Sequence, residues 1–455
     1  MSVWSRYRIG GLSTTDRPAG LGVSAPGTTR LEGIDGLRAI AAGSILVYHV
    51  WLYSQYGWQL ADFGPLSRYV FPHLPLGVTL FFTLSAFLLY RPIAAAIVDG
   101  LPRPNIRTYL LNRGLRILPA YWVVLAATAV VLPASTIRTG TDTLELGRMV
   151  HDPELLLRNA GLAQNYSPES LLTGITPAWS LAVEAVFYLV LPVLGMLAAA
   201  CAAAGRMQTR GRMIAALIPA AVLLAVGLSG KAVASTWIVS AGSPTAGWDG
   251  DWHSVVVRTF WGQADLFTFG IVLAVIFVGL ERELISLPRW WRWPVSAGFL
   301  GAAAAIAAFA DRGLWQAGKN PYELTGAFGC TLLLALVVLH PAESSVRPGP
   351  LVRLLTTRAV VVVGLCSYSI FLWHEPLVRL LRSQEWTFPG QRGWILNLVL
   401  VVVSTAIAAA ATYRWVEQPA LRRKRRPSRG DRSRPDATTA EPGRSAHGTV
   451  APVRK

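Results

Sequence analysis

The chain has 455 residues, of which 53% are hydrophobic and only 15% are charged, and its mean hydropathy is +0.42. A soluble chain carries about 25% charged residues, so this composition excludes an ordinary soluble protein and favours an integral membrane protein. In a soluble protein, the net charge of +17 would indicate nucleic-acid binding. Here the basic residues lie between apolar segments and in the C-terminal tail, so topology explains them and we predict no nucleic-acid partner. The three cysteines show neither metal-site spacing nor a disulfide pattern.

Residues 1–34 are polar and contain no signal-peptide pattern, so we expect a disordered N-terminal tail. Over 35–420 we predict a single all-α bundle of about ten transmembrane helices, because ten apolar segments have about the length that spans a bilayer. Residues 421–455 predict a basic disordered tail, which either contacts anionic lipid or is a plain stop-transfer charge run. The ten segments run over 37–56, 74–95, 115–135, 180–204, 211–229, 260–280, 294–310, 322–341, 359–380 and 392–416.

Lys and Arg are unevenly divided between the two alternating sets of connections. The set that includes both tails carries 29 of them and the opposite set carries 11. Since cytoplasmic segments hold the excess of basic residues, we predict that both termini are cytoplasmic. The loop over 137–178 would then face outward, and whether it acts as a lid is left open.

The first apolar segment carries Arg38 and His49 eleven residues apart. On a helix, this spacing returns a side chain to within about 20° of the same face and climbs about 16 Å. A titratable group inside a membrane is costly and is a functional candidate by default. Imidazole is also the side chain best suited to proton transfer near neutral pH.

Five motifs carry a resemblance to a known family. They read EGIDGLRAIAAGSILVYHV, then GVTLFFTLSAFLLYRP with NRGLRILPAYW, then PAWSLAVEAVFYLVLP, GLCSYSIFLWHEPL and TYRWVEQPALRR. In this order and spacing they resemble the bacterial membrane-bound acyltransferase type 3 family, from about residue 32 to 421. Ala86 replaces the glycine usual in the family's LSGF motif, which is an exchange of one small residue for another.

The resemblance implies transfer of an acyl group, acetyl or another short one, from the co-substrate acyl-coenzyme A (acyl-CoA) to a hydroxyl, usually on a sugar. It implies no permanently bound cofactor. The family's arginine and histidine of the first helix match Arg38 and His49. Its Arg-x-x-Arg motif matches Arg113 and Arg116, and the glutamate of its Trp-Ser-Leu-x-x-Glu motif matches Glu184.

A sugar hydroxyl is a poor nucleophile at neutral pH, so a base must take its proton during attack on a thioester. We predict His49 as this base and Glu184 as the carboxylate that orients it, since both would lie about 7–10 Å below the outer surface. The alternatives are a helix-packing role for His49 and a helix-capping role for Glu184.

The same depth argument adds Asp265 and His374, and Trp179 marks the outer start of its helix. We assign these three residues to acceptor binding, because a sugar needs many hydrogen-bond partners. A structural role for Asp265 and a capping role for His374 remain open. His49 and His374 with carboxylates could hold a metal, but no ligand spacing such as HExxH supports it, and we predict none.

Arg103, Arg107, Arg113 and Arg116 form a basic stretch on the predicted inner side. Arginine grips phosphate through paired donors, and coenzyme A carries three phosphates, so we place the donor headgroup at Arg113 and Arg116. For Arg103 and Arg107, positive-inside charge alone is the favoured explanation. Arg38 either pairs with Asp35 or faces the donor phosphate. Near the C-terminus, Glu417 is expected to pair with Arg422 or Arg423.

The sequence therefore predicts a multi-pass O-acyltransferase of a bacterial plasma membrane. The acceptor is either an envelope glycan or a sugar on a secondary metabolite, and it enters from the outer face or from the cytosol. Family members with an extracytoplasmic esterase-like domain differ from this sequence, so we expect transfer to finish in the membrane domain or on a separate extracytoplasmic partner protein. The alternative function is a transporter or flippase for lipid-linked glycans, which predicts related halves with broken helices. The sequence shows no such halves.

Overall fold

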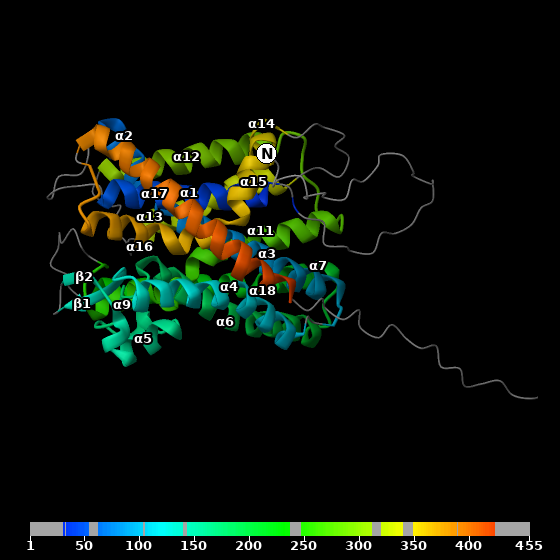
Figure 1. Cartoon of the computed structure of the whole chain (residues 1–455). Helices are drawn as coiled ribbons and strands as arrows, with labels where there is room; N and C mark the ends of the chain where they lie inside the picture. The colour runs from blue at the N-terminus through cyan, green and yellow to red at the C-terminus, as the bar shows by residue number, and fades with distance from the viewer. Residues whose placement is uncertain are drawn as a thin grey trace, which may run out of the picture.

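The computed structural model describes residue 31 and residues 33–53, 62–102, 105–139, 143–236, 247–311, 320–339, 349–388 and 390–423. Both predicted tails lie almost wholly outside the described residues. Within them, long helices lie side by side in one bundle, and a small β-hairpin lies at one end (Figure 1).

The first half of the described chain contains eight α-helices and one β-hairpin. Its helices are α1 (Ile34–Tyr53), α2 (Pro65–Tyr69), α3 (Leu76–Asp99), α4 (Ile106–Ala126), α5 (Pro153–Ala160), α6 (Trp179–Ala204), α7 (Thr209–Ala215) and α8 (Ile218–Thr236). Strands β1 (Ser135–Thr139) and β2 (Thr143–Gly147) lie between α4 and α5.

The second half begins with two short helices, and its longest helix is α17 near the C-terminal end. It contains α9 (Trp252–Arg258), α10 (Phe260–Gln263), α11 (Thr268–Glu281), α12 (Arg292–Asp311), α13 (Asn320–Val338), α14 (Pro350–Leu355), α15 (Arg358–Leu365), α16 (Ser367–Ser383), α17 (Gly390–Thr412) and α18 (Gln418–Arg422). A 3₁₀ turn over Ala264–Phe267 joins α10 to α11, and a π-helical turn over Tyr413–Glu417 joins α17 to α18.

Eight helical stretches of the described chain are long and apolar enough to cross a membrane, and α15 with α16 makes a ninth if that bent pair counts as one span. These nine coincide with nine of the ten predicted segments. The tenth, α1, is a 20-residue helix that does not reach the same apolarity, because Asp35 and Arg38 lie in its first turns. The described chain is thus an all-α, multi-pass membrane protein, and the count of about ten spans stays a prediction.

Helix α3 forms the centre of the bundle and packs against α1, α6, α11 and α13. Its large side chains Phe82, Phe87 and Tyr90 are fully buried. Glycine permits the closest approach: a methyl group at Gly270 of α11 would lie 2.5 Å from the backbone oxygen of Thr83. Lipid supplies no hydrophobic driving force between helices, so association depends on close packing, which small residues at the contacts permit.

One element departs from the all-α prediction. Strands β1 and β2 pair antiparallel within the loop predicted over 137–178, with Ser135 opposite Gly147. Thr136 also bridges to Gly174, whose positive φ of 73° suits a glycine. The loop is therefore a built structure that covers one end of the bundle, together with α5 and α9 (Figure 1).

The opposite end holds the start of α1 together with α7, α14 and α18 (Figure 1). There, Arg282 after α11 is bound at 2.8 Å to Asp99 at the end of α3. The pair α15 and α16 bends by 69° at Cys366. A methyl group at Gly364 of α15 would lie 1.8 Å from the backbone oxygen of Asp35, so only glycine allows this contact with α1.

Candidate functional site

A cavity lies between α1, α3, α4, α6 and α16, and its empty space, counted together with the open solvent at its mouth, is about 720 Å³. Three arginines line it: Arg38 from α1, and Arg113 and Arg116 from α4. The other polar lining groups are Ser85, Ser180, Glu184, Tyr188, Ser367 and Tyr368. The predicted arginine set is therefore gathered in one hollow from two helices far apart in the sequence.

The three arginines of the cavity differ in their local contacts. Arg38 lies 3.7 Å from Asp35, which is the i, i+3 pair that the sequence allowed, and it also faces the cavity. Arg116 forms an ion pair of 2.9 Å with the buried Glu417. The Nε atom of Arg113 is buried and has no hydrogen-bond partner among the described residues. Arg113 thus lines the cavity with one of its N–H groups buried and unpartnered among the described residues.

The pairing expected for Glu417 with Arg422 or Arg423 is wrong. Glu417 contacts Arg116 on α4, and it accepts a hydrogen bond of 3.0 Å from the Ser369 hydroxyl on α16. The π-helical turn before α18 directs Glu417 into the bundle, where its side chain is fully buried. Arg107 is exposed and Arg103 lies outside the described residues.

Glu184 does not lie where the sequence placed it. Its carboxylate accepts a hydrogen bond from the Ser85 hydroxyl and faces the cavity. No described contact joins it to His49. Helix rise predicts depth in the membrane, but it does not predict which neighbour a face of the helix meets. Glu184 is therefore a group of the arginine-lined cavity.

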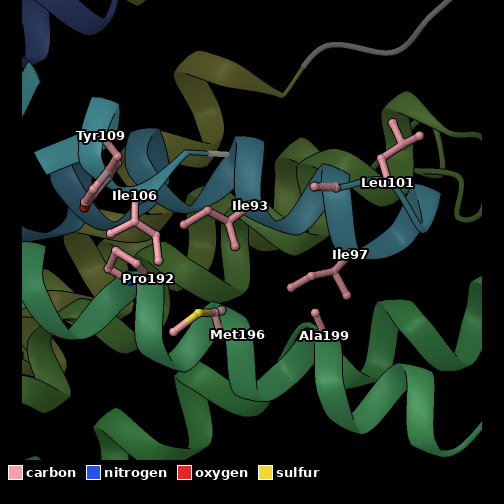
Figure 2. A pocket seen from close by; sticks show the side chains of 10 residues that line it. Ile93, Ile97, Leu101, Ile106, Tyr109, Pro192, Met196 and Ala199 are labelled. Carbon is pink, nitrogen blue, oxygen red and sulfur yellow. The ribbon is translucent and has the colours of Figure 1, made fainter. Parts of the chain in front are cut away.

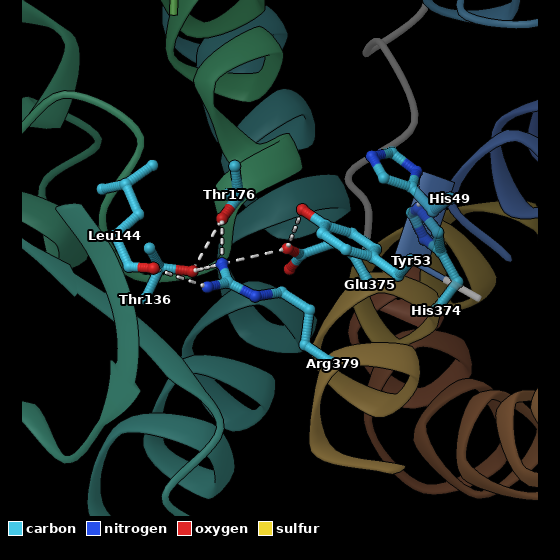
Figure 3. Close-up of polar contacts among 8 residues, drawn as sticks. All are labelled: His49, Tyr53, Thr136, Leu144, Thr176, His374, Glu375 and Arg379. Atoms are coloured by element: carbon cyan, nitrogen blue, oxygen red, sulfur yellow. Dashed lines mark hydrogen bonds and ion pairs between the residues drawn. The ribbon is translucent and has the colours of Figure 1, made fainter. Parts of the chain in front are cut away.

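His49 instead meets His374. Nδ1 of His49 lies 3.0 Å from Nε2 of His374, and the two ring centroids are 4.9 Å apart. Figure 3 shows the two imidazoles side by side, one from α1 and one from α16. The ring of Phe371, which lines the cavity, lies 5.8 Å from that of His374. The imidazole pair thus does not line the cavity, and His374 lies next to Phe371 of its wall.

A second polar network starts one residue after His374. Glu375 accepts a hydrogen bond of 3.3 Å from the Tyr53 hydroxyl and pairs at 3.3 Å with Arg379 (Figure 3). Arg379 also donates to Thr136 of β1 and to the backbone oxygen of Leu144 in β2. The sequence analysis missed Glu375 and Arg379. Their i, i+4 spacing on an apolar helix beside a histidine is the signal that could have found them.

Asp265 belongs to a separate buried cluster. It lies 2.7 Å from the Lys231 amine, which is also 2.8 Å from Glu323. These side chains come from α8, the turn before α11, and α13, and Lys231 is 2% exposed. The predicted group of His49, Glu184, Asp265 and His374 is therefore not one cluster: the structure brings together only the two histidines.

Trp179, the first residue of α6, is buried beneath a cation. The guanidinium of Arg258 lies 4.6 Å from its ring centroid and 3.6 Å from that of Trp248. Such contacts fix an arginine between two aromatic faces. Trp179 thus has a packing role in the structure, and its assignment to acceptor binding stays a prediction.

A second hollow, of about 470 Å³, lies between α3, α4 and α6 and is lined by apolar side chains (Figure 2). Ile93, Pro192 and Met196 form part of its wall, and Tyr109 is its one polar lining residue. It offers no charge to a phosphate. Among the described residues, no three His, Cys, Asp or Glu side chains group as metal ligands.

Comparison with known proteins finds relatives that are named as O-acetyltransferases. The chain is 24% identical over 408 residues to the "Putative peptidoglycan O-acetyltransferase YrhL" of Bacillus subtilis, with 86% of this chain and 54% of the relative covered. It is 24% identical to the O-acetyltransferase OatA of Staphylococcus aureus, with 87% and 57% covered. For the peptidoglycan O-acetyltransferase OatA of Listeria monocytogenes, the identity is 21% and the coverages are 86% and 55%.

The chain thus spans about half the length of these curated relatives. No solved structure matches it. The model of the family described as "Acyltransferase domain" matches residues 31–414, which include the arginine-lined cavity and both histidines of the imidazole pair. The chain therefore belongs to the acyltransferase type 3 family, a family of membrane transferases.

Proposed function

We propose that this protein transfers a short acyl group, such as acetyl, from acyl-CoA to a hydroxyl of a cell-envelope glycan in a bacterial plasma membrane. Family membership supports the acyl transfer. The names of the relatives favour a glycan, peptidoglycan in two of them, over a secondary-metabolite sugar.

The observation that carries the proposal is the arginine-lined cavity, with the imidazole pair next to Phe371 of its wall. Arg38, Arg113 and Arg116 present several N–H donors to a hollow partly withdrawn from water. Such a site suits the phosphates of coenzyme A. Arg38 and His49 are separated by about 16 Å along α1, so the elongated donor bridges the two groups.

The difference in charge between the two ends of the bundle indicates from which side each substrate enters. The end with the start of α1, α7, α14 and α18 belongs to the more basic set of segments, so we place it in the cytosol, where acyl-CoA is made. The pantetheine arm then passes along the cavity toward His49. The acceptor approaches from the end that carries β1 and β2.

Within this arrangement, Nε2 of His49 takes the proton of the acceptor hydroxyl as the hydroxyl oxygen attacks the thioester carbon. The carbon–sulfur bond breaks, an ester forms, and the departing thiolate takes the proton from His49, so that free coenzyme A leaves. Glu184 offers carboxylate oxygens inside the cavity, where the amide N–H groups of the pantetheine arm pass. It also lowers the net positive charge of the cavity.

The first test compares His49→Ala with wild type in nanodiscs supplied with acetyl-CoA and peptidoglycan fragments, with release of the free thiol as readout. Loss of a general base lowers kcat by about 10²- to 10⁴-fold. His151→Ala, at an exposed histidine outside the cavity, is the matched control. Equal release by His49→Ala and wild type would remove His49 from the chemistry. Folded wild-type protein that releases no thiol would refute acyl transfer and leave the transporter function.

The donor site is tested by Arg113→Ala, with the exposed Arg107→Ala on the same helix as control. Loss of charge-assisted hydrogen bonds should raise the apparent KM for acetyl-CoA about 10- to 100-fold in Arg113→Ala alone. The apparent KM for the glycan should not change. A change confined to the glycan KM would overturn the placement of the donor. The extracytoplasmic partner protein stays a prediction.

A further inference from the structure

Three short contacts fix the protons of the imidazole pair. Nδ1 of His49 lies 3.0 Å from the backbone oxygen of Ile45 and 3.0 Å from Nε2 of His374. Nδ1 of His374 lies 3.2 Å from the backbone oxygen of Ile370. A carbonyl oxygen only accepts hydrogen bonds, so the nitrogen that faces it must carry the proton.

Only one arrangement of neutral tautomers satisfies all three contacts. With a proton on each Nδ1, His374 donates to Ile370, and its Nε2 accepts from His49, whose Nδ1–H is shared with Ile45. If the protons were on the Nε2 atoms instead, the lone pair of each Nδ1 would face a lone pair of a carbonyl oxygen, which is repulsive. It follows that Nε2 of His49 keeps its lone pair, and no described residue bonds to it.

The two histidines also differ in access. His374 is 1% exposed, whereas His49 is only partly buried. The helix of His374, α16, is bound to two neighbouring helices: the Trp373 indole donates to the Thr412 hydroxyl on α17, and Glu375 accepts from the Tyr53 hydroxyl on α1. His374 is therefore fixed in place and enclosed, and only His49 presents a nitrogen to a substrate.

We infer that His374 is a positioning residue, and that the hydrogen bond from His49 Nδ1 to His374 Nε2 keeps the proton-accepting Nε2 of His49 directed at the acceptor hydroxyl. His374 does the work that the sequence assigned to Glu184. When His49 takes up a proton, the same hydrogen bond becomes charge-assisted and holds the imidazolium. This inference rests on the proposed function for the reaction, but the tautomer itself is a property of the protein without substrate.

The test uses nitrogen NMR of ¹⁵N-histidine-labelled protein in nanodiscs, which is practical because the chain has 7 histidines. His49→Ala assigns the His49 signals. In wild type, Nδ1 of His49 should carry the proton and Nε2 should be bare. His374→Phe should mix the two tautomers, whereas His374→Gln should keep the wild-type one, because its amide oxygen still accepts a hydrogen bond.

Acyl transfer gives the second readout. His374→Phe should lower kcat about 10- to 100-fold with little change in the KM for acetyl-CoA, and His374→Gln should recover most of the loss. His151→Gln, at an exposed histidine, should match wild type. A wild-type His49 protonated at Nε2, or a fully active His374→Phe, would overturn the inference. If the wild-type protein shows the expected tautomers but transfers no acyl group, the proposed function is refuted and the tautomer assignment stands.

Discussion

The cluster of Asp265, Lys231 and Glu323 allows a quantitative test of the role of Asp265, which the sequence assigned to acceptor binding. One ammonium neutralises two carboxylates at 2.7 and 2.8 Å, and the side chains of Lys231 and Asp265 are fully buried. Lys231→Met removes this ammonium and leaves the buried Asp265 carboxylate without its ion pair. Breaking a buried ion pair from one side costs about 3–5 kcal/mol, so the free energy of unfolding should fall by about that amount.

Asp265→Asn is the informative companion variant. It leaves Lys231 paired with Glu323, so it should cost about 1–3 kcal/mol, less than Lys231→Met. The variant Lys231→Met/Asp265→Asn/Glu323→Gln carries no charge in the cluster and should be more stable than Lys231→Met alone. Ser235→Met, at an exposed position of α8, is the control and should match wild type.

Unfolding would be followed by tryptophan fluorescence during titration of mixed micelles with a denaturing detergent. The folded Asp265→Asn protein should also keep the wild-type apparent KM for the glycan, because Asp265 is bound to Lys231. A Lys231→Met protein as stable as wild type would refute the reasoning on buried charge. A glycan KM raised by Asp265→Asn would restore the acceptor-binding assignment.

Three further predictions concern contacts between elements. Glu417→Gln should lower the free energy of unfolding by about 1–3 kcal/mol, because Arg116 loses its ion pair, whereas Arg422→Ala should have no effect in the same detergent titration. Gly77→Ala should cost about 1–3 kcal/mol, since its methyl group would lie 2.6 Å from the Ala41 oxygen; Gly43→Ala, with open space around it, is the thermal-unfolding control. Arg379→Met should free the β1–β2 hairpin and speed its cleavage in limited proteolysis, and exposed Arg382→Met should not.

The sequence predicted the helices well because each is a long apolar run, and the bilayer sets the length that such a run needs. The three arginines that it selected, Arg38, Arg113 and Arg116, line one cavity, and their role in donor binding stays a prediction. It missed the hairpin, whose strands are five residues each and lie in a polar loop. Strands that short have no periodicity strong enough to separate them from irregular structure.

The errors in the site have one physical origin. Depth along a helix can be calculated from its rise, and it correctly brought His49 and His374 to one level. Which helix faces which depends on packing, and sequence spacing is silent about that. Glu184 therefore went to the arginine cavity and Asp265 to Lys231, although both matched His49 in calculated depth.

The bend at Cys366 sets how much length variation the family can accept there. Helix α15 is fitted to the start of α1 through Gly364, and α16 is fitted to its end through His374. One inserted residue at the bend would turn α16 by about 100° relative to α15 and carry His374 away from His49. The start of α1 and Arg38 would keep their surroundings. Functional homologues should therefore tolerate sequence change in the bend far better than a change in its length.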